Sequence, residues 1–192
     1  MNGPVPVRET RLETAQVMTP NDANFLGKVF GGVILAHIDL VAYATASRFA
    51  GNICVTASFD RVDFLQPIEL GELVTMIGHV SYVGRTSVEV SVSVFAENVY
   101  TRVRRHTNTA RVTMVAVKDG KPVEVPRLAC ETREEKIEFL EGRLRREMRA
   151  VHLAERERVA TLIRAATDEK LDELMDTRSL LDPGWLNPDT AG

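Results

Sequence analysis

The chain has 192 residues with a formal net charge of −3, and 44% of its residues are hydrophobic. That length suits one sizeable core with a small appendage. Its basic residues are interleaved with acidic ones, and the longest apolar run, Val33 to Ala46, falls short of the ~20 residues of a membrane helix. The N-terminal region has no apolar signal-peptide core, and Cys54 and Cys130 form neither a disulfide framework nor a zinc pattern. We therefore expect a cytoplasmic protein with reduced thiols, no metal, and no nucleic-acid or membrane partner.

Hydrophobic patterning predicts one strand, a long helix and then four more strands. The first strand covers residues 8–17, and a loop follows over residues 18–28. The helix spans Val33 to Phe49, because this segment is Ala-rich, lacks internal Gly and Pro, and is followed by Gly51. The four strand-like runs are residues 55–65, 73–83, 88–94 and 107–117. The spacers between these runs are too short for helices, so the order predicts an α+β fold with an antiparallel sheet and one main helix.

The composition changes after Pro126. Residues 131–178 are rich in Glu and Arg and contain no proline. Apolar residues recur there at steps of three and four, at Ile137, Leu140, Leu144, Met148 and Val151. This pattern predicts one or two amphipathic helices that pack on the sheet or on another subunit; a coiled coil is disfavoured because the heptad fails at Glu147 and Arg158. Residues 179–192 are expected to form a loose tail.

Residues 24–39 carry the strongest chemical signal. A polar loop with Asn24 runs into Gly31 and Gly32, and Asp39 then interrupts an apolar helix. An ionised carboxylate is costly to bury without a partner, so Asp39 in this setting indicates a function. The glycines permit close approach of a ligand, and the free N–H groups of a helix start favour a developing negative charge. A carboxylate, an amide and oriented N–H donors suit attack on a carbonyl group.

These and further motifs resemble the hotdog-fold acyl-CoA thioesterases, in particular the cytosolic acyl-CoA hydrolase family with its brain-type and bacterial members. The motifs are Met18-Thr-Pro, Asn24, Gly27, Phe30-Gly-Gly, Ile38-Asp39, Arg61 to Ile68, Gly71-Glu72, Ser87-Val-Glu-Val, Glu97-Asn98, Thr107-Asn108 and Ala110. The resemblance implies a hotdog domain over residues 8–127, in which an antiparallel sheet wraps around one long central helix. A charged helical extension over residues 131–178 follows it. Homodimers that assemble into homohexamers, with acyl-CoA across the dimer interface, are also implied.

The resemblance assigns catalysis to Asn24 and Asp39, with the asparagine facing the aspartate of a neighbouring subunit. Asp39 would be either a general base that activates water or a nucleophile that forms a transient anhydride. The alternatives are a structural, hydrogen-bonded Asp39 and an Asn24 that only forms a turn or helix cap. An N–H of Gly31 or Gly32 would polarise the thioester carbonyl, unless these glycines only permit tight packing. His37 does not share a helical face with Asp39, so we expect a packed or interfacial histidine.

Coenzyme A is expected at the turn Gly84-Arg85-Thr86-Ser87 and at Arg127. Backbone N–H groups and Arg85 would contact its phosphates; the alternatives are an ordinary hairpin turn and a surface arginine. A second basic group comprises Arg143, Arg145, Arg146 and Arg149. We expect these arginines to form a solvated helix face; the alternative is contact with the 3′-phosphate of coenzyme A.

The implied reaction is hydrolysis of an acyl-CoA thioester to a free acid and coenzyme A. It needs no metal or redox cofactor, because coenzyme A is part of the substrate. One rival is a hotdog hydratase or dehydratase, which would use a histidine where this loop has Asn24. The other rival is a non-catalytic acyl-CoA sensor on the same fold.

Overall fold

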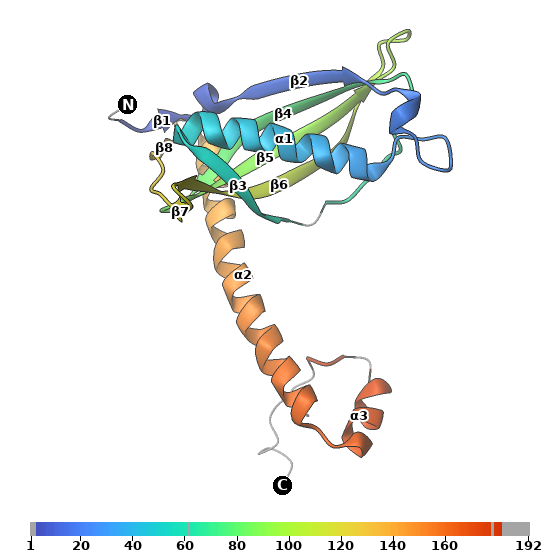
Figure 1. Ribbon diagram of the computed structural model, residues 1–192, viewed down its shortest axis with the longest axis vertical. Coiled ribbons are helices and arrows are strands. Elements are labelled where there is room, and N and C mark those ends of the chain that lie inside the picture. Colours follow the sequence, from blue (N-terminus) through green and yellow to red (C-terminus); the bar gives the residue numbers. More distant parts are fainter. Residues whose placement is uncertain (1–2, 61, 178, 182–192) are drawn as a thin grey trace. The chain divides into compact units, whose positions relative to one another are not determined.

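The computed structural model describes residues 3–60, 62–177 and 179–181. The chain forms two compact units, Met1–Gly142 and Arg143–Gly192. The first contains a six-stranded sheet in which β2, β4, β5, β6 and β3 are neighbours in that order, with β7 beside β6. Its strands are β2 (Leu12–Val17), β3 (Ile53–Phe59), β4 (Leu73–Val83), β5 (Ser87–Glu97), β6 (Arg104–Lys118) and β7 (Lys121–Pro122). Every pairing in this sheet is antiparallel (Figure 1).

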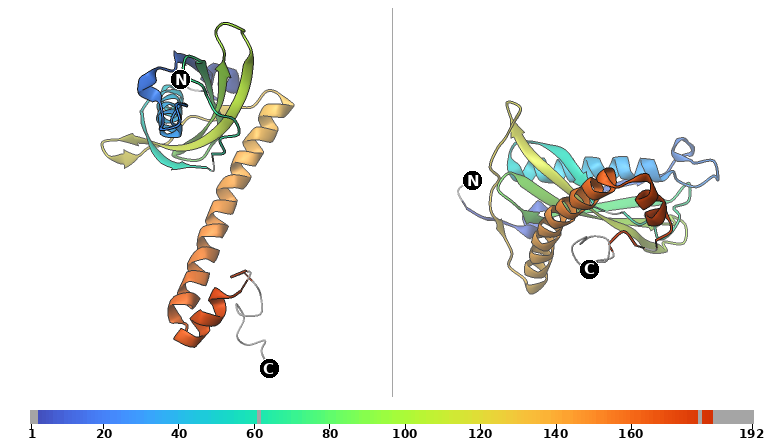
Figure 2. Two further views of the ribbon diagram at one scale, coloured as in Figure 1. Left: turned by 90° about the vertical axis from the view of Figure 1, so that its right-hand side faces the viewer. Right: turned by 90° about the horizontal axis from the view of Figure 1, so that it is seen from below.

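The sheet curves around one long helix, α1 (Gly31–Ala50), as the left view of Figure 2 makes plain. Alternate residues of the central strands point at this helix and are almost completely buried, as period-two patterning requires. They include Val74, Met76, Val80, Val88, Val90, Val92, Val94, Ala110, Val112, Met114 and Ala116. Gly78 allows the close approach, because a Cβ there would lie 2.8 Å from both Val41 Cγ1 and Thr45 Oγ1. The predicted arrangement of an antiparallel sheet around one central helix is confirmed.

Two predicted strand boundaries are wrong. The first strand begins at Leu12 rather than at residue 8, because a 3-10 turn, η1 (Val7–Thr10), occupies the preceding residues. Thr10 Oγ1 donates to Val7 O and accepts from Val80 N, which fixes this turn against β4. The strand predicted over residues 55–65 ends at Phe59, and residues 62–65 have no regular structure. The helix and the remaining strands lie where the sequence predicts them, within a few residues at their ends.

A short parallel pair, β1 (Val5–Pro6) and β8 (Leu128–Ala129), precedes the second long helix, α2 (Arg133–Ala165). The first turns of α2 pack on the face of the sheet opposite α1. Phe139 contacts Tyr82 with ring centroids 5.0 Å apart, and His79 Nε2 lies 2.8 Å from Glu138 Oε2. Gly142 permits this packing, because a Cβ there would lie 2.5 Å from Tyr82 Cβ.

The second unit contains the rest of α2 and a short helix, α3 (Asp168–Met175). Thr167 caps α3 by accepting a hydrogen bond from Lys170 N, and Val159 and Leu174 are buried. The expected tail over residues 179–192 lies mostly outside the described residues. The division of the chain into residues 8–127 and 131–178 stays a prediction.

By length and composition alone, α1 would pass for a membrane span. Eight of its residues are buried within the chain, among them Ile34, Ile38 and Val41. It is the core helix of the sheet.

Candidate active site

Asp39 is held by a threonine on the neighbouring edge strand. Thr56 Oγ1 donates a hydrogen bond of 2.6 Å to Asp39 Oδ1, and the same oxygen lies 3.5 Å from Met114 Sδ. The pairing register between β3 and β6 shifts between Thr56 and Ser58, and such a bulge re-aims the side chains around it. The sequence alone does not mark Thr56 as a site residue. A threonine in a strand is common, and only its contact with the aspartate marks it.

Asp39 is not fully buried in the single chain, although it interrupts an apolar segment of the sequence. The neighbouring residues Ile38, Val41 and Ala42 are buried against the sheet, whereas Asp39 is only half-buried and Leu40 is exposed. The reason is geometric, because successive helix residues point about 100° apart and Asp39 faces the edge strand β3 instead of the sheet centre. One carboxylate oxygen is fixed by Thr56, and the carboxylate as a whole remains accessible.

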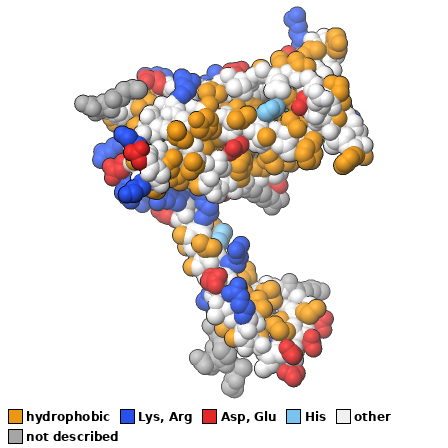
Figure 3. All heavy atoms as spheres, viewed as in Figure 1, with side chains coloured by type: hydrophobic (Ala, Val, Ile, Leu, Met, Phe, Trp, Pro, Cys, Tyr) orange, Lys and Arg blue, Asp and Glu red, His pale blue; other side chains and the backbone are white. Residues whose placement is uncertain are grey.

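Large apolar side chains lie exposed on α1, on β3 and on the loops that flank them. Figure 3 shows hydrophobic side chains spread across the face of the first unit on which α1 lies. The exposed set from α1, β3 and the flanking loops comprises Phe30, Leu40, Tyr43, Ile53, Val55, Phe59, Phe64 and Leu65. Among the described residues β3 pairs with β6 alone, so its other edge is open. An open strand edge beside a large apolar surface is typical of a protein interface.

Asn24 lies in the loop before α1, and its side-chain oxygen forms hydrogen bonds within that loop. Asn24 Oδ1 accepts hydrogen bonds from Leu26 N and Lys28 N, at 2.9 and 3.1 Å. Gly27, whose φ is +71°, completes the tight turn. Asn24 therefore does form a turn, which is the alternative role expected for it. The Nδ2 group finds no acceptor among the described residues, so the free capacity of Asn24 is that of a hydrogen-bond donor. No contact joins Asn24 and Asp39 within the described part of the chain.

Gly31 and Gly32 form the first turn of α1. Their N–H groups have no intrahelical acceptor by helix geometry, and the described residues offer none. Both glycines also lie against aromatic rings. A Cβ on Gly32 would come within 2.4 Å of the Phe30 ring, and one on Gly31 within 3.5 Å of the Phe64 ring. The two predicted roles, carbonyl polarisation and tight packing, are thus compatible at this position.

The turn predicted to bind coenzyme A connects β4 and β5. Gly84 N donates to Ser87 O, while the carbonyls of Arg85 and Thr86 accept from Val125 N and Ala116 N. Arg85 is 78% exposed and lies 3.7 Å from Glu124 Oε1. The segment that contacts this turn continues to Arg127, whose side chain is exposed, so Arg85 and Arg127 come to the same end of the sheet.

This turn and the Asn24 loop lie at opposite ends of the sheet. The Asn24 loop is tied to the start of β4, because Lys28 pairs with Glu69 at 2.6 Å. The turn follows the end of β4, which has 11 residues. At about 3.3 Å per residue the strand separates the two by about 35 Å. One chain does not bring them together.

His37 lies on the other side of α1. It lines a cavity of about 270 Å³ between α1 and β2, together with residues such as Thr14, Gln16, Leu40 and Ala44. As predicted, it does not share the face of Asp39. Among the described residues no group of three or more His, Cys, Asp and Glu side chains could hold a metal ion.

Comparisons with known proteins place these features in one family context. A family model described as Thioesterase superfamily matches residues 26–103. Protein VdlD of Helicobacter pylori is 41% identical over 141 residues, which cover 73% of this chain and 80% of that protein. YkhA of Bacillus subtilis, described as an uncharacterised acyl-CoA thioester hydrolase, is 39% identical over 67% of this chain and 75% of its own length.

Solved structures of acyl-CoA hydrolases are similar to this chain along most of its length. An acyl-CoA hydrolase from Bacillus cereus superposes with a TM-score of 0.75 at 40% identity, covering 84% of this chain and 98% of that one. An apo-hexameric acyl-CoA thioesterase gives a TM-score of 0.76 at 39% identity, covering 79% and 98%. The hotdog fold predicted from the sequence is therefore confirmed. Structures are also known for an acyl-CoA hydrolase from Staphylococcus aureus in which an aspartate, a threonine or an asparagine is replaced by alanine.

Proposed function

The chain belongs to the thioesterase superfamily, and on that premise we propose that it hydrolyses acyl-CoA thioesters to a free carboxylic acid and coenzyme A. The observation that carries the proposal is the carboxylate of Asp39, hydrogen-bonded to Thr56 at an open, apolar edge of the sheet. An accessible carboxylate in apolar surroundings suits both proton abstraction and nucleophilic attack. The reaction needs only water besides the acyl-CoA.

The variants of the staphylococcal hydrolase support these residues. The asparagine, aspartate and threonine replaced there have the same spacing as Asn24, Asp39 and Thr56 in this chain. That chain is about one-third identical to this one, and the asparagine variant was solved with coenzyme A bound. We therefore propose Asn24, Asp39 and Thr56 as the polar residues of the site.

In the proposed reaction, Thr56 orients Asp39 through Oδ1 and leaves Oδ2 free. As a general base, Oδ2 takes a proton from water while the water oxygen bonds to the thioester carbon. The tetrahedral intermediate then collapses, the C–S bond breaks, and coenzyme A leaves as the thiolate and takes up a proton. As a nucleophile, Oδ2 bonds to that carbon itself, the C–S bond breaks, and coenzyme A leaves as the thiolate and takes up a proton. Water then hydrolyses the resulting anhydride, which releases the free acid and restores Asp39. In both routes the N–H groups of Gly31 and Gly32 would stabilise the carbonyl oxygen as it becomes negative.

A second copy of the chain would complete the site. Pairing of two β3 edges in antiparallel orientation would cover the apolar surface around Asp39 and continue the sheet. It would also bring the Asn24 loop of one copy towards Asp39 of the other, with Asn24 Nδ2 as the donor to the substrate carbonyl or to water. We propose a homodimer of this kind as the unit of a homohexamer, with coenzyme A near Arg85 and Arg127. The hexameric relative supports the larger assembly. A cytoplasmic location is proposed as well, in keeping with a human relative described as cytosolic, of which this chain covers 35%.

The test is release of free thiol from acyl-CoA substrates of increasing chain length. We expect turnover by the wild-type protein and at least a ~100-fold lower kcat for Asp39→Asn. Asp119→Asn is the matched control, because Asp119 lies in the exposed turn after β6 with a positive φ that asparagine also tolerates. Acyl-CoA binding without thiol release by the wild-type protein would favour the sensor; water addition to an enoyl-CoA would favour the hydratase.

A further inference from the structure

One face of α2 carries a symmetric apolar stripe. The stripe, called the α2 stripe below, comprises Ile137, Leu140, Leu144, Met148 and Val151, which are 41–66% exposed. Their spacings of three, four, four and three residues read the same in both directions from Leu144. At 3.6 residues per turn they lie on one line along the helix.

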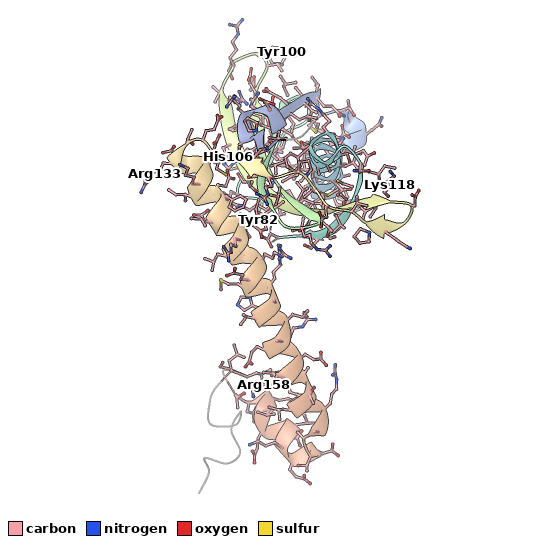
Figure 4. The ribbon with its side chains drawn as sticks, turned by 90° about the vertical axis from the view of Figure 1, so that its left-hand side faces the viewer. Tyr82, Tyr100, His106, Lys118, Arg133 and Arg158 are labelled. Atoms are coloured by element: carbon pink, nitrogen blue, oxygen red, sulfur yellow. The ribbon has the colours of Figure 1, made fainter. Side chains whose placement is uncertain are left out.

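Within the first unit, the stripe residues Ile137 and Leu140 do not face the sheet. Glu138, Phe139 and Gly142 face the sheet instead: Glu138 contacts His79, and Phe139 and Gly142 lie against Tyr82. Figure 4 shows Tyr82 on the sheet beside the first turns of α2. Ile137 and Leu140 alternate with these residues around the helix and therefore point elsewhere. An exposed run of five large apolar side chains on one helix is costly in water and indicates a partner.

We propose that the partner is a second copy of this chain, whose α2 packs antiparallel against the first on a two-fold axis at Leu144. A two-fold interface must be self-complementary, and a stripe that is symmetric about Leu144 places apolar side chains opposite apolar side chains along its whole length when two copies pack antiparallel. The two Leu144 side chains then meet on the axis. Leu140 lies opposite the partner's Met148, and Ile137 opposite the partner's Val151.

The charges at the ends of the stripe fit this orientation. Arg133 and Glu155 lie on the same helical line as the stripe and are equidistant from Leu144, one on each side. The antiparallel arrangement places Arg133 opposite the partner's Glu155 at both ends. A parallel arrangement would place arginine opposite arginine and glutamate opposite glutamate, which is unfavourable. Glu155 also pairs with Arg158 at 2.8 Å in its own helix, and its 42% exposed side chain can accept from both arginines.

This contact uses a surface separate from the β3 edge and from the proposed catalytic residues. A chain with two different two-fold contacts can close into an assembly larger than a dimer. The helical extension would then serve the assembly of the protein, a role distinct from hydrolysis.

The first test measures molar mass by light scattering after size exclusion. Leu144→Glu puts two carboxylates on the proposed axis, so we expect the wild-type assembly to fall to a smaller species while thioester hydrolysis is kept. Leu153→Glu is the matched control, because Leu153 is 64% exposed on the opposite face of the same helix. It should leave the mass unchanged. An unchanged mass for Leu144→Glu, or an equal loss in both variants, overturns the proposal.

A second test fixes the orientation and does not depend on one disruptive substitution. Arg133→Glu should lower the mass of the assembly, and adding Glu155→Arg should restore it, because the swapped pair is again complementary. In a Cys130→Ser background, Ile137→Cys together with Val151→Cys should cross-link two chains on oxidation, while Ile137→Cys alone should not. Cross-linking by Ile137→Cys alone would indicate a parallel pair and would contradict the antiparallel one.

Discussion

The hydrogen bond between Thr56 and Asp39 is the most direct target for a substitution. Thr56→Val replaces the hydroxyl by a methyl group of similar size, so the packing near Met114 is kept while the donor to Asp39 Oδ1 is lost. A hydrogen bond to a charged group contributes about 1.5–3 kcal/mol. Thr56 is exposed in the single chain, so we take the lower part of that range. Since 1.36 kcal/mol corresponds to a factor of ten in rate, kcat should fall by roughly 10- to 30-fold.

The assay is steady-state hydrolysis of one acyl-CoA by the wild-type protein and by Thr56→Val and Thr56→Ser. The serine retains the hydroxyl and should keep kcat within a few-fold of the wild type. KM should change little in either variant, because the bond orients a reacting group and does not hold the substrate. Full activity of Thr56→Val would refute the positioning role. Equal losses in the valine and serine variants would indicate a packing defect instead.

Three further predictions concern the dimer, the ligand and the fold. Mixing inactive Asn24→Ala and Asp39→Ala chains should restore part of the activity, because subunit exchange rebuilds one complete site; a mixed dimer, confirmed by native mass spectrometry, that stays inactive would place the site within one chain. Arg85→Ala should raise KM about fivefold for acyl-CoA with kcat unchanged, since Arg85 is largely exposed, and should not affect an acyl-pantetheine, which lacks the nucleotide. Arg105 donates two hydrogen bonds, of 2.6 and 2.7 Å, to the buried carboxylate of Glu72 and thereby lowers its pKa. The pair therefore stabilises the fold above the ordinary glutamate pKa of 4.5, and this stabilisation is lost as the pH falls through the lowered value. Arg105→Met should cost about 2–3 kcal/mol of unfolding free energy at pH 7, and the cost should shrink progressively as the pH is lowered below 4.5, measured by urea denaturation over a pH series; a cost that stays constant over the whole series would contradict an ionic origin.

The architecture could be predicted from the sequence because its hydrophobic signals are periodic. The Val-Ser alternation of β5 and the Ala-rich stretch of α1 are each typical of one structure, and the structure contains both. The end of β3 could not be predicted in this way. Val62, Phe64 and Leu65 follow Phe59 among charged residues and leave a strand possible, but β3 ends where its pairing with β6 ends, and that pairing depends on tertiary register.

The candidate site could be predicted from the sequence only in part. Asp39 stands out as a charge in an apolar helix, whereas Thr56 resembles any other strand threonine until the fold places it 2.6 Å from the carboxylate. The use of Asn24 Oδ1 within its own loop also depends on backbone geometry that composition does not encode. A sequence pattern can therefore mark an unusual residue such as Asp39, but only the fold shows which common residues, such as Thr56, contact it.

The loop geometry constrains what Asn24 could contribute. Its oxygen already accepts two backbone hydrogen bonds, so only its Nδ2 donors are left for a substrate. Donors suit a carbonyl oxygen that gains negative charge, while Asp39 on the other copy is an acceptor that suits a proton or an electrophilic carbon. Two copies of the chain would thus bring opposite polar functions to one thioester, with an apolar surface that excludes bulk water around them. Within a single copy no hydrogen bond joins Asn24 and Asp39, and the turn expected to bind coenzyme A lies about 35 Å from the Asn24 loop, which is why the proposed activity would require the assembled protein.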